Sequence, residues 1–119
     1  MRVVLYKIFY ITILCFTVLT LAAQKDNDRI IQAADYFMQG SSYYKGEGVK
    51  QDYARAVKFF QQAAEAGHAE AQYFTAWHYE HGKGVKRNLK MAKLWYKKSA
   101  EQGDKDAKKA LKQLKYYLF

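Results

Sequence analysis

The residue types that could bind a metal gather around one short stretch of the chain. His78, Glu80 and His81 lie close together, and His68 comes ten residues before His78. Histidine and carboxylate side chains are zinc ligands, and two histidines three positions apart share one helix face. However, His81 lies at the predicted end of its helix, His78 points to a different side from Glu80, and no third ligand is well spaced. We therefore predict no metal site and no cofactor.

No pairing of a nucleophile with its base stands out either, whether Ser-His-Asp or Cys-His. Two glycine pairs, Gly46-x-Gly48 and Gly82-x-Gly84, precede predicted helices. They lack the strand–turn–helix setting of a phosphate-binding loop, so we interpret them as turns. The sequence thus predicts no catalytic residues and a protein that is not an enzyme. A hydrolase acting on cell-wall material is the weakest alternative, kept because a fold does not fix a function.

The glycine pairs belong to a repeat with a period of 36 residues. After Gly46-x-Gly48-Val49 and its second copy, an acidic or amide residue, an alanine and an aromatic pair recur at the same offset. A fixed period of this length is typical of a helical solenoid, in which each unit buries its apolar face on its neighbour. The matched residues are Asp52 with Asn88, Ala56 with Ala92, Phe59-Phe60 with Trp95-Tyr96, and Ala64-Glu65-x-Gly67 with Ala100-Glu101-x-Gly103.

Apolar periodicity, capping residues and the absence of proline predict five helices. The sequence predicts a right-handed all-α solenoid of antiparallel hairpins, with units at about 33–68 and 69–104 in a domain at 29–119. A capping helix covers 105–119, with Leu118 on its apolar face. We expect Ile30, Ala33, Ala34, Phe37 and Met38 to face the core in a first helix at about 29–44. Val49 is expected to dip into the core.

The first 23 residues have the three-part plan of a secretory signal peptide. Arg2 and Lys7 form a basic start, an uncharged apolar run follows from Ile8 to Leu21, and small residues come next. We predict cleavage after Ala22 or Ala23, a polar linker at 24–28, and an exported, periplasmic or secreted protein. The alternative is an uncleaved anchor in the inner membrane. Cys15, the only cysteine, lies inside the apolar run, so the mature chain would have no disulfide.

The repeated pattern of Gly-x-Gly-Val, Asp or Asn, an aromatic pair and Ala-Glu-x-Gly resembles the Sel1-like repeat family. The resemblance extends from Ala33 to about Ala107. It implies an α/α solenoid related to tetratricopeptide repeats, which serves as an adaptor in protein complexes. Exported bacterial members often act at the cell envelope or toward a host. The family usually has Leu-Gly in its first helix, where this chain has Gln39-Gly40 and Thr75-Ala76. Its cysteine-rich secreted branch carries disulfides that this chain lacks.

The first helix of each unit in such a solenoid lines the concave surface, which indicates where a partner would bind. We expect Gln72, Thr75, Ala76 and Tyr79 to face the core. The adjacent residues form two strips that together would bind a protein or peptide, since aromatic anchors among polar groups are typical of binding hot spots. The alternative is that the aromatic residues only pack between repeats. The strips comprise Phe37, Ser41 and Tyr44 in the first unit and Tyr73, Trp77, Glu80 and His81 in the second.

Charge gives a second lead, because the net charge of +9 is unevenly distributed along the chain. Residues 24–82 have six basic and eight acidic residues, whereas residues 83–119 have twelve basic and three acidic ones. A basic face with Lys93, Lys97, Lys108 and Lys112 could bind an anionic membrane or glycan. The alternative is a solvated face that maintains solubility. We expect no nucleic acid partner, and we expect self-association to be feasible because two complete units are few for a solenoid.

Overall fold

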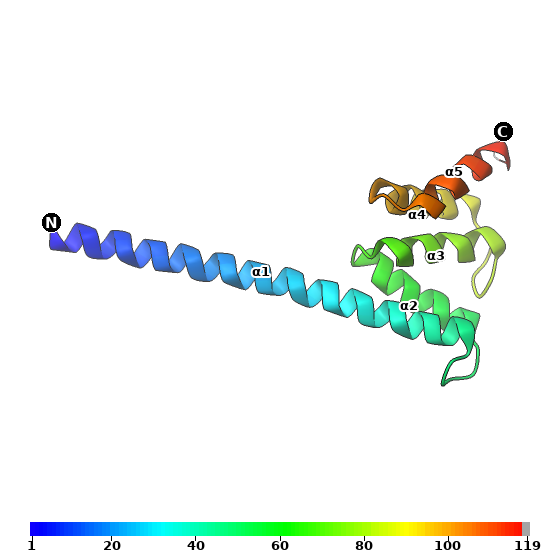
Figure 1. Cartoon of the computed structure of the whole chain (residues 1–119), viewed down its shortest axis with the longest axis horizontal. Coiled ribbons are helices and arrows are strands. Elements are labelled where there is room, and N and C mark those ends of the chain that lie inside the picture. The colour runs from blue at the N-terminus through cyan, green and yellow to red at the C-terminus, as the bar shows by residue number, and fades with distance from the viewer. Residues whose placement is uncertain (118–119) are drawn as a thin grey trace.

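The computed structural model describes residues 1–117, which form five helices and no strand. The helices are α1 (Arg2–Lys45), α2 (Tyr53–Glu65), α3 (Ala69–His81), α4 (Leu89–Glu101) and α5 (Lys105–Tyr117). The C-terminal part of α1 forms a hairpin with α2, α3 forms one with α4, and α5 packs on α4 (Figure 1). The predicted all-α solenoid with a capping helix is confirmed.

Both units use the same devices to reverse the chain. Gly46 and Gly82 end α1 and α3 with positive φ angles of 75° and 62°, a left-handed conformation that favours glycine. Asp52 caps α2 by accepting a hydrogen bond from the backbone N–H of Arg55 at 3.1 Å. Asn88 caps α4 in the same way, accepting from the N–H of Met91 at 3.1 Å. The capping residues and the glycine stops therefore have the structures that the sequence predicted.

The core alternates small and aromatic residues along the facing helices. Ala56, Ala63 and Ala64 on α2 and Ala92 on α4 are fully or almost fully buried, which lets neighbouring helices approach closely. Larger side chains fill the space that remains, so the layers interlock. They include Phe60, Trp95, Tyr96 and Leu114. A partly buried hydrogen bond from the hydroxyl of Ser99 to the carbonyl of Ala69, 2.8 Å long, joins α4 to the start of α3.

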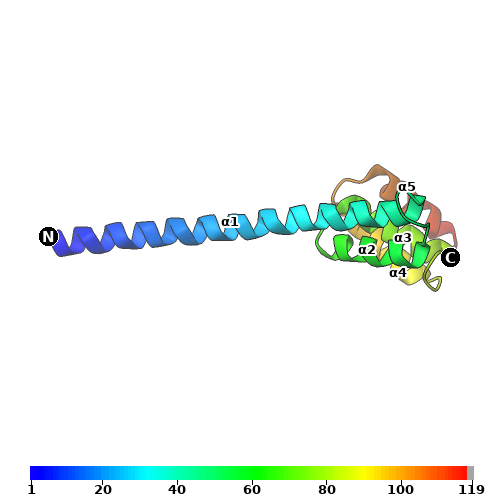
Figure 2. The same ribbon diagram turned by 90° about the horizontal axis from the view of Figure 1, so that it is seen from below.

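Helix α1 differs from the prediction at its N-terminal side. It continues through Gln24–Asp28, where the sequence predicted a linker, and the helix therefore does not begin near Arg29. No glycine or proline comes before Gly40, so nothing breaks the helix here, although Asp26, Asn27 and Asp28 are themselves poor helix formers. The part of α1 before residue 30 projects away from the hairpins in both views (Figures 1 and 2). Residues 2–32 are exposed along their whole length.

The outer face of α1 is not core, so the prediction for Ile30 and Met38 is wrong. Their side chains are 66% and 60% exposed. Among the described residues, only the exposed helical residues 2–32 come before the first unit, and they do not cover this face. The positions that are buried in α3 accordingly carry more polar residues in α1: Asp35, Gln39 and Ser42 stand where α3 has Ala71, Thr75 and His78. These polar residues suit the solvated outer face of a terminal unit, although Met38 is exposed on the same face.

Val49 also lies outside the core, 38% exposed, whereas its counterpart Val85 is half-buried. The second turn has a preceding unit to pack against: at Gly84 an added Cβ would meet the backbone of Tyr53. At Gly48 an added Cβ would meet nothing within 4 Å. The two turns are therefore alike in sequence but differ in packing. At the C-terminus, Tyr116 is exposed, and the predicted core position Leu118 lies outside the described residues.

Candidate partner-binding strip

The candidate site is the inner strip, defined as the seven residues predicted on the first helices of the two units. Phe37, Ser41 and Tyr44 come from α1, and Tyr73, Trp77, Glu80 and His81 come from α3. Six of the seven are half-buried and His81 is exposed. The strip is therefore neither closed core nor fully solvated surface. Whether it binds a partner stays a prediction.

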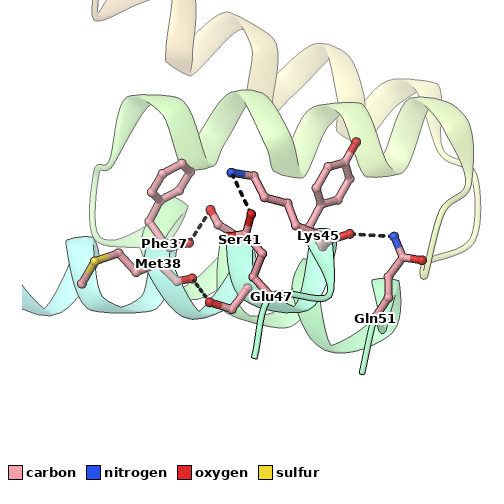
Figure 3. Close-up of polar contacts among 8 residues, drawn as sticks. Phe37, Met38, Ser41, Lys45, Glu47 and Gln51 are labelled. Atoms are coloured by element: carbon pink, nitrogen blue, oxygen red, sulfur yellow. Dashed lines mark hydrogen bonds and ion pairs between the residues drawn. The ribbon is translucent and has the colours of Figure 1, made fainter. Parts of the chain in front are cut away.

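The α1 part of the strip is fixed by local contacts at the end of its helix (Figure 3). The hydroxyl of Ser41 donates to the carbonyl of Phe37 at 2.9 Å, so its polar atom is satisfied within the helix. The Phe37 ring stacks on His68 with a centroid separation of 4.6 Å. The side-chain amide of Gln51 donates to the carbonyl of Tyr44 at 2.8 Å and ties the turn to the helix end. The stack on His68 orients the Phe37 ring, and the two hydrogen bonds to backbone carbonyls fix the end of the helix.

Trp77 connects the two parts of the strip. Its ring makes an edge-to-face contact with Tyr44, with centroids 5.9 Å apart, and it stacks on His81 at 4.4 Å. The Nδ1 of His81 donates to the carbonyl of Trp77 at 2.9 Å, which orients the imidazole. Edge-to-face and offset-stacked geometries are the favourable arrangements for aromatic pairs. The structure thus brings residues of both units together into one continuous aromatic surface.

The polar groups of the strip include the carboxylate of Glu80 and the hydroxyl of Tyr73. The hydroxyl of Tyr96 donates to Oε2 of Glu80 at 2.6 Å, while the nearest basic nitrogen to this carboxylate, Nδ1 of His81, is 4.0 Å away. Burial raises the pKa of Tyr73, and the carboxylates of Asp106, Asp104 and Glu80 add to this effect. Burial and the bond to Glu80 also raise the pKa of Tyr96. Both phenols stay neutral at physiological pH and can act as hydrogen-bond donors.

At its C-terminal end, the strip opens into a cleft of about 230 Å³ between α3, α4 and α5. Sequence reasoning identified two of its lining residues, Glu80 and His81, and missed the remainder. One signal was present: Tyr117 follows His81 by 36 residues, so the repeat offset itself places Tyr117 at the equivalent position on the next helix. The other lining residues are Arg87, Leu89 and Leu114.

The histidines that could have been metal ligands make separate hydrogen bonds. His78 is fully buried, and its Nδ1 donates to the carbonyl of Lys83 at 2.7 Å. Nδ1 of His68 accepts from the backbone N–H of Ala71 at 3.2 Å and caps α3. Within residues 1–117, no three histidine, cysteine, aspartate or glutamate side chains are grouped as metal ligands. The hydrogen bonds of His78 and His68 are therefore to the backbone of the fold.

The four lysines of the predicted basic face are all exposed. Lys93 and Lys97 lie one helical turn apart on α4, and Lys108 and Lys112 lie one turn apart on α5. Because α4 and α5 run in opposite directions, Lys93 and Lys112 are closer to the end of the domain that carries the Gly-x-Gly turns. In the described part of the chain, none of the four is in an ion pair within 4.0 Å.

A family model for the Sel1 repeat matches residues 33–68 and 69–104. The chain belongs to the Sel1 repeat family. Proteins built from Sel1 repeats are generally scaffolds for protein–protein interaction. The resemblance seen in the sequence is thereby confirmed, and so is the solenoid class.

Solved structures of other Sel1 repeat proteins have the same architecture. A Sel1 repeat protein from Oxalobacter formigenes is 37% identical with a TM-score of 0.67, and the alignment covers 68% of this chain and 61% of that one. A protective antigen with this fold from uropathogenic Escherichia coli is 40% identical with a TM-score of 0.62, covering 63% of this chain and 16% of the antigen.

The cysteine rich protein B of Helicobacter pylori is 25% identical with a TM-score of 0.64. That alignment covers 66% of this chain and 59% of the Helicobacter protein. This Sel1 repeat chain therefore spans less than two thirds of each of the three structures. No curated protein matches the chain.

Proposed function

We propose that this chain is an exported, non-enzymatic interaction module that binds a peptide or protein along the inner strip. The observation that carries the proposal is the half-buried Trp77, which joins Tyr44 and His81 into one aromatic surface across two units. Partly exposed aromatic residues held rigidly by their neighbours lose little entropy on binding, which is why tryptophan and tyrosine dominate binding hot spots. Membership of a family of interaction scaffolds agrees with this function.

Alanine substitution of Trp77 and Tyr73 tests this proposal. Capture of partner proteins from an envelope fraction of the source cells should weaken by at least about 30-fold, since a hot-spot residue contributes about 2 kcal/mol or more. The far-UV circular dichroism should stay helical. Leu94→Ala, an exposed position on α4, is the matched control and should capture partners normally. Unchanged capture by the Trp77 and Tyr73 variants would reject the inner strip as the binding surface.

The export part of the proposal is supported by the apolar N-terminal part of α1. This helix is long and apolar enough to cross a membrane, none of its apolar window is buried in the protein, and it lies near the N-terminus. These properties fit both a signal segment and an uncleaved anchor in the inner membrane. N-terminal sequencing of the protein recovered from the envelope would distinguish the two. A chain found intact in the cytoplasm would contradict export.

A second candidate function is binding of an anionic lipid or glycan through the basic face. The observation that favours it is that Lys93, Lys97, Lys108 and Lys112 are exposed and have no acidic partner among the described residues. Retention on anionic vesicles should then fall sharply as salt is added, because salt screens exposed charges. Retention that does not change with salt would reject this function.

A further inference from the structure

The repeat domain has two ends that differ in chemistry. Because the helices alternate in direction, the two Gly-x-Gly turns at residues 46–52 and 82–88 lie at the same end as the C-terminal end of α5 (Figure 1). We call this the turn end. The turns at Gly67 and Gly103 lie at the opposite end, and the apolar part of α1 projects on that side in both views (Figures 1 and 2).

Positive charge differs between the two ends of the domain as well as along the chain. The halves of the helices next to the Gly-x-Gly turns, together with these turns, comprise residues 39–58, 76–94 and 112–117. They hold eleven basic and three acidic residues, a net charge of +8. The other halves, residues 33–38, 59–75 and 95–111, hold five basic and six acidic residues, a net charge of −1. The turn end therefore carries a strong positive charge, whereas the opposite end is close to neutral.

Most of the cations at the turn end make no ion pair with the described residues, although Nε of Arg87 donates to the carbonyl of Glu80 at 3.0 Å and Arg55 lies over the Tyr43 ring. Among residues 1–117, the only ion pairs of the basic residues at the turn end join Lys45 to Glu47 at 4.0 Å and Arg55 to Asp52 at 3.5 Å. Helices α2 and α4 begin at this end, and neither has an acidic residue in its first turn. The first turn of α4 contains the cation Lys90, although the helix dipole favours negative charge at this position. Helix stability therefore does not explain the position of Lys90, and an external anion at this end would offset the repulsion between these cations.

The turn end is continuous with the inner strip. Lys45 directly follows the strip residue Tyr44, and the cleft that contains Glu80 and His81 is also lined by Arg87. A second hollow of about 470 Å³ at the first turn is lined by Lys50 and Arg55, among others. An extended chain that follows the strip to this end would therefore reach basic side chains, of which Lys50 makes no ion pair with the described residues.

We propose that the turn end binds an acidic segment of the same polypeptide partner whose apolar part lies along the inner strip. This inference rests on the proposed function and specifies the chemistry of the partner: aromatic or aliphatic side chains next to a run of aspartate or glutamate. Charge complementarity selects the acidic segment and accelerates its encounter with the module. A flat bilayer could not reach into the strip, and a bilayer that held the apolar part of α1 would lie at the opposite end.

The test uses the full chain in a neutral detergent and a fluorescein-labelled peptide of 20 glutamates as the probe. The variant Lys50→Gln, Lys86→Gln, Lys90→Gln removes three exposed charges at the turn end. Lys97→Gln, Lys105→Gln, Lys108→Gln removes three exposed charges near the other end and leaves the same net charge. We expect the turn-end variant to bind about tenfold more weakly than the unmodified chain and to show a weaker salt dependence, since three of the eleven basic side chains at this end lose their charge. The control variant should bind within about twofold.

An equal loss of affinity in both triple variants would overturn the proposal, because it would show attraction to net charge alone. Phosphatidylglycerol vesicles that bind through the turn end, with no binding of the glutamate peptide, would also overturn it in favour of a lipid ligand. The probe has no aromatic residue, so its binding does not depend on Trp77 and Tyr73. A failure of the inner strip in the capture experiment therefore remains distinguishable from a failure of the turn end.

Discussion

His78 is a buried titratable group inside an aromatic cluster. The rings of Tyr44, Phe60 and Trp77 lie 5.3–5.7 Å from its own ring centroid. Its Nδ1 must carry the proton, because the carbonyl of Lys83 can only accept a hydrogen bond, and its Nε2 has no partner. Burial lowers the pKa of His78, and the charge of nearby His81 lowers it further, whereas the bond to Lys83 acts in the opposite direction. The folded state therefore prefers neutral imidazole.

We predict that this histidine makes the domain less stable in acid. A lowered pKa in the folded state means that the unfolded chain binds more protons, so the free energy of unfolding falls as the pH drops below about 6.5, the ordinary histidine value. Above that pH the stabilisation is fully present. Urea unfolding at pH 7.5 and pH 5.5 should show this loss in the unmodified chain and in His81→Gln, but less in His78→Gln. Identical pH dependence in all three proteins would contradict it.

At the scale of the elements, the two Gly-x-Gly turns show how position in the stack changes the role of identical residues. Gly48 and Gly84 both have positive φ angles, 74° and 70°. Only Gly84 approaches another element, since the backbone of Tyr53 at the start of α2 lies where a Cβ would be. The second turn is thus a contact between units, and the first turn is a free edge.

We therefore expect Gly84→Ala to destabilise the domain more than Gly48→Ala does. Both substitutions place an alanine in the left-handed region, at a cost of about 1–2 kcal/mol. Gly84→Ala also forces the backbone of Tyr53 to move, which should add at least about 1 kcal/mol. Thermal unfolding followed by circular dichroism measures both. Equal melting temperatures for the two variants would show that the contact between the second turn and α2 does not contribute to stability.

At the scale of the whole molecule, the domain is a short stack whose helices contact mainly their sequence neighbours. One end of the stack is covered by α5, which buries Ala107 and Leu114 and exposes its lysines. The other end is the outer face of α1, where Asp35, Gln39 and Ser42 are polar. Both ends have the solvated character of terminal units, and the projecting part of α1 adds no packing to the stack.

Removal of residues 1–23 should therefore leave the repeat domain folded. These residues are exposed throughout, so the shortened chain and the full chain should melt within about 2 °C of each other in the same neutral detergent. A chain that begins at Met38 is the comparison: it lacks the buried Ala33 and the half-buried Phe37 and should melt at a clearly lower temperature. A large loss of stability on removing residues 1–23 alone would show that the projecting helix supports the fold.

Local chemistry was sufficient to predict the hairpins. Capping by Asp52 and Asn88 and reversal at Gly46 and Gly82 depend on residues within a few positions, so the sequence pattern alone predicts them. The period of 36 residues then predicts the stack, because identical hairpins bury identical faces. The inner strip follows from the same spacing, and its rings do lie together across α1 and α3. Binding to it remains a prediction.

What a residue contacts beyond its own hairpin depended on the tertiary structure. Val49 and Val85 have the same local sequence, yet only Val85 has a preceding unit to cover it, so sequence spacing could not distinguish exposed from half-buried. The distribution of charge over the surface also depends on the tertiary structure. Along the chain, the excess lies after residue 82, but antiparallel packing brings the cations of both units to the turn end. Sequence determines which hairpins form, and the direction and order of packing decide which side chains share a surface.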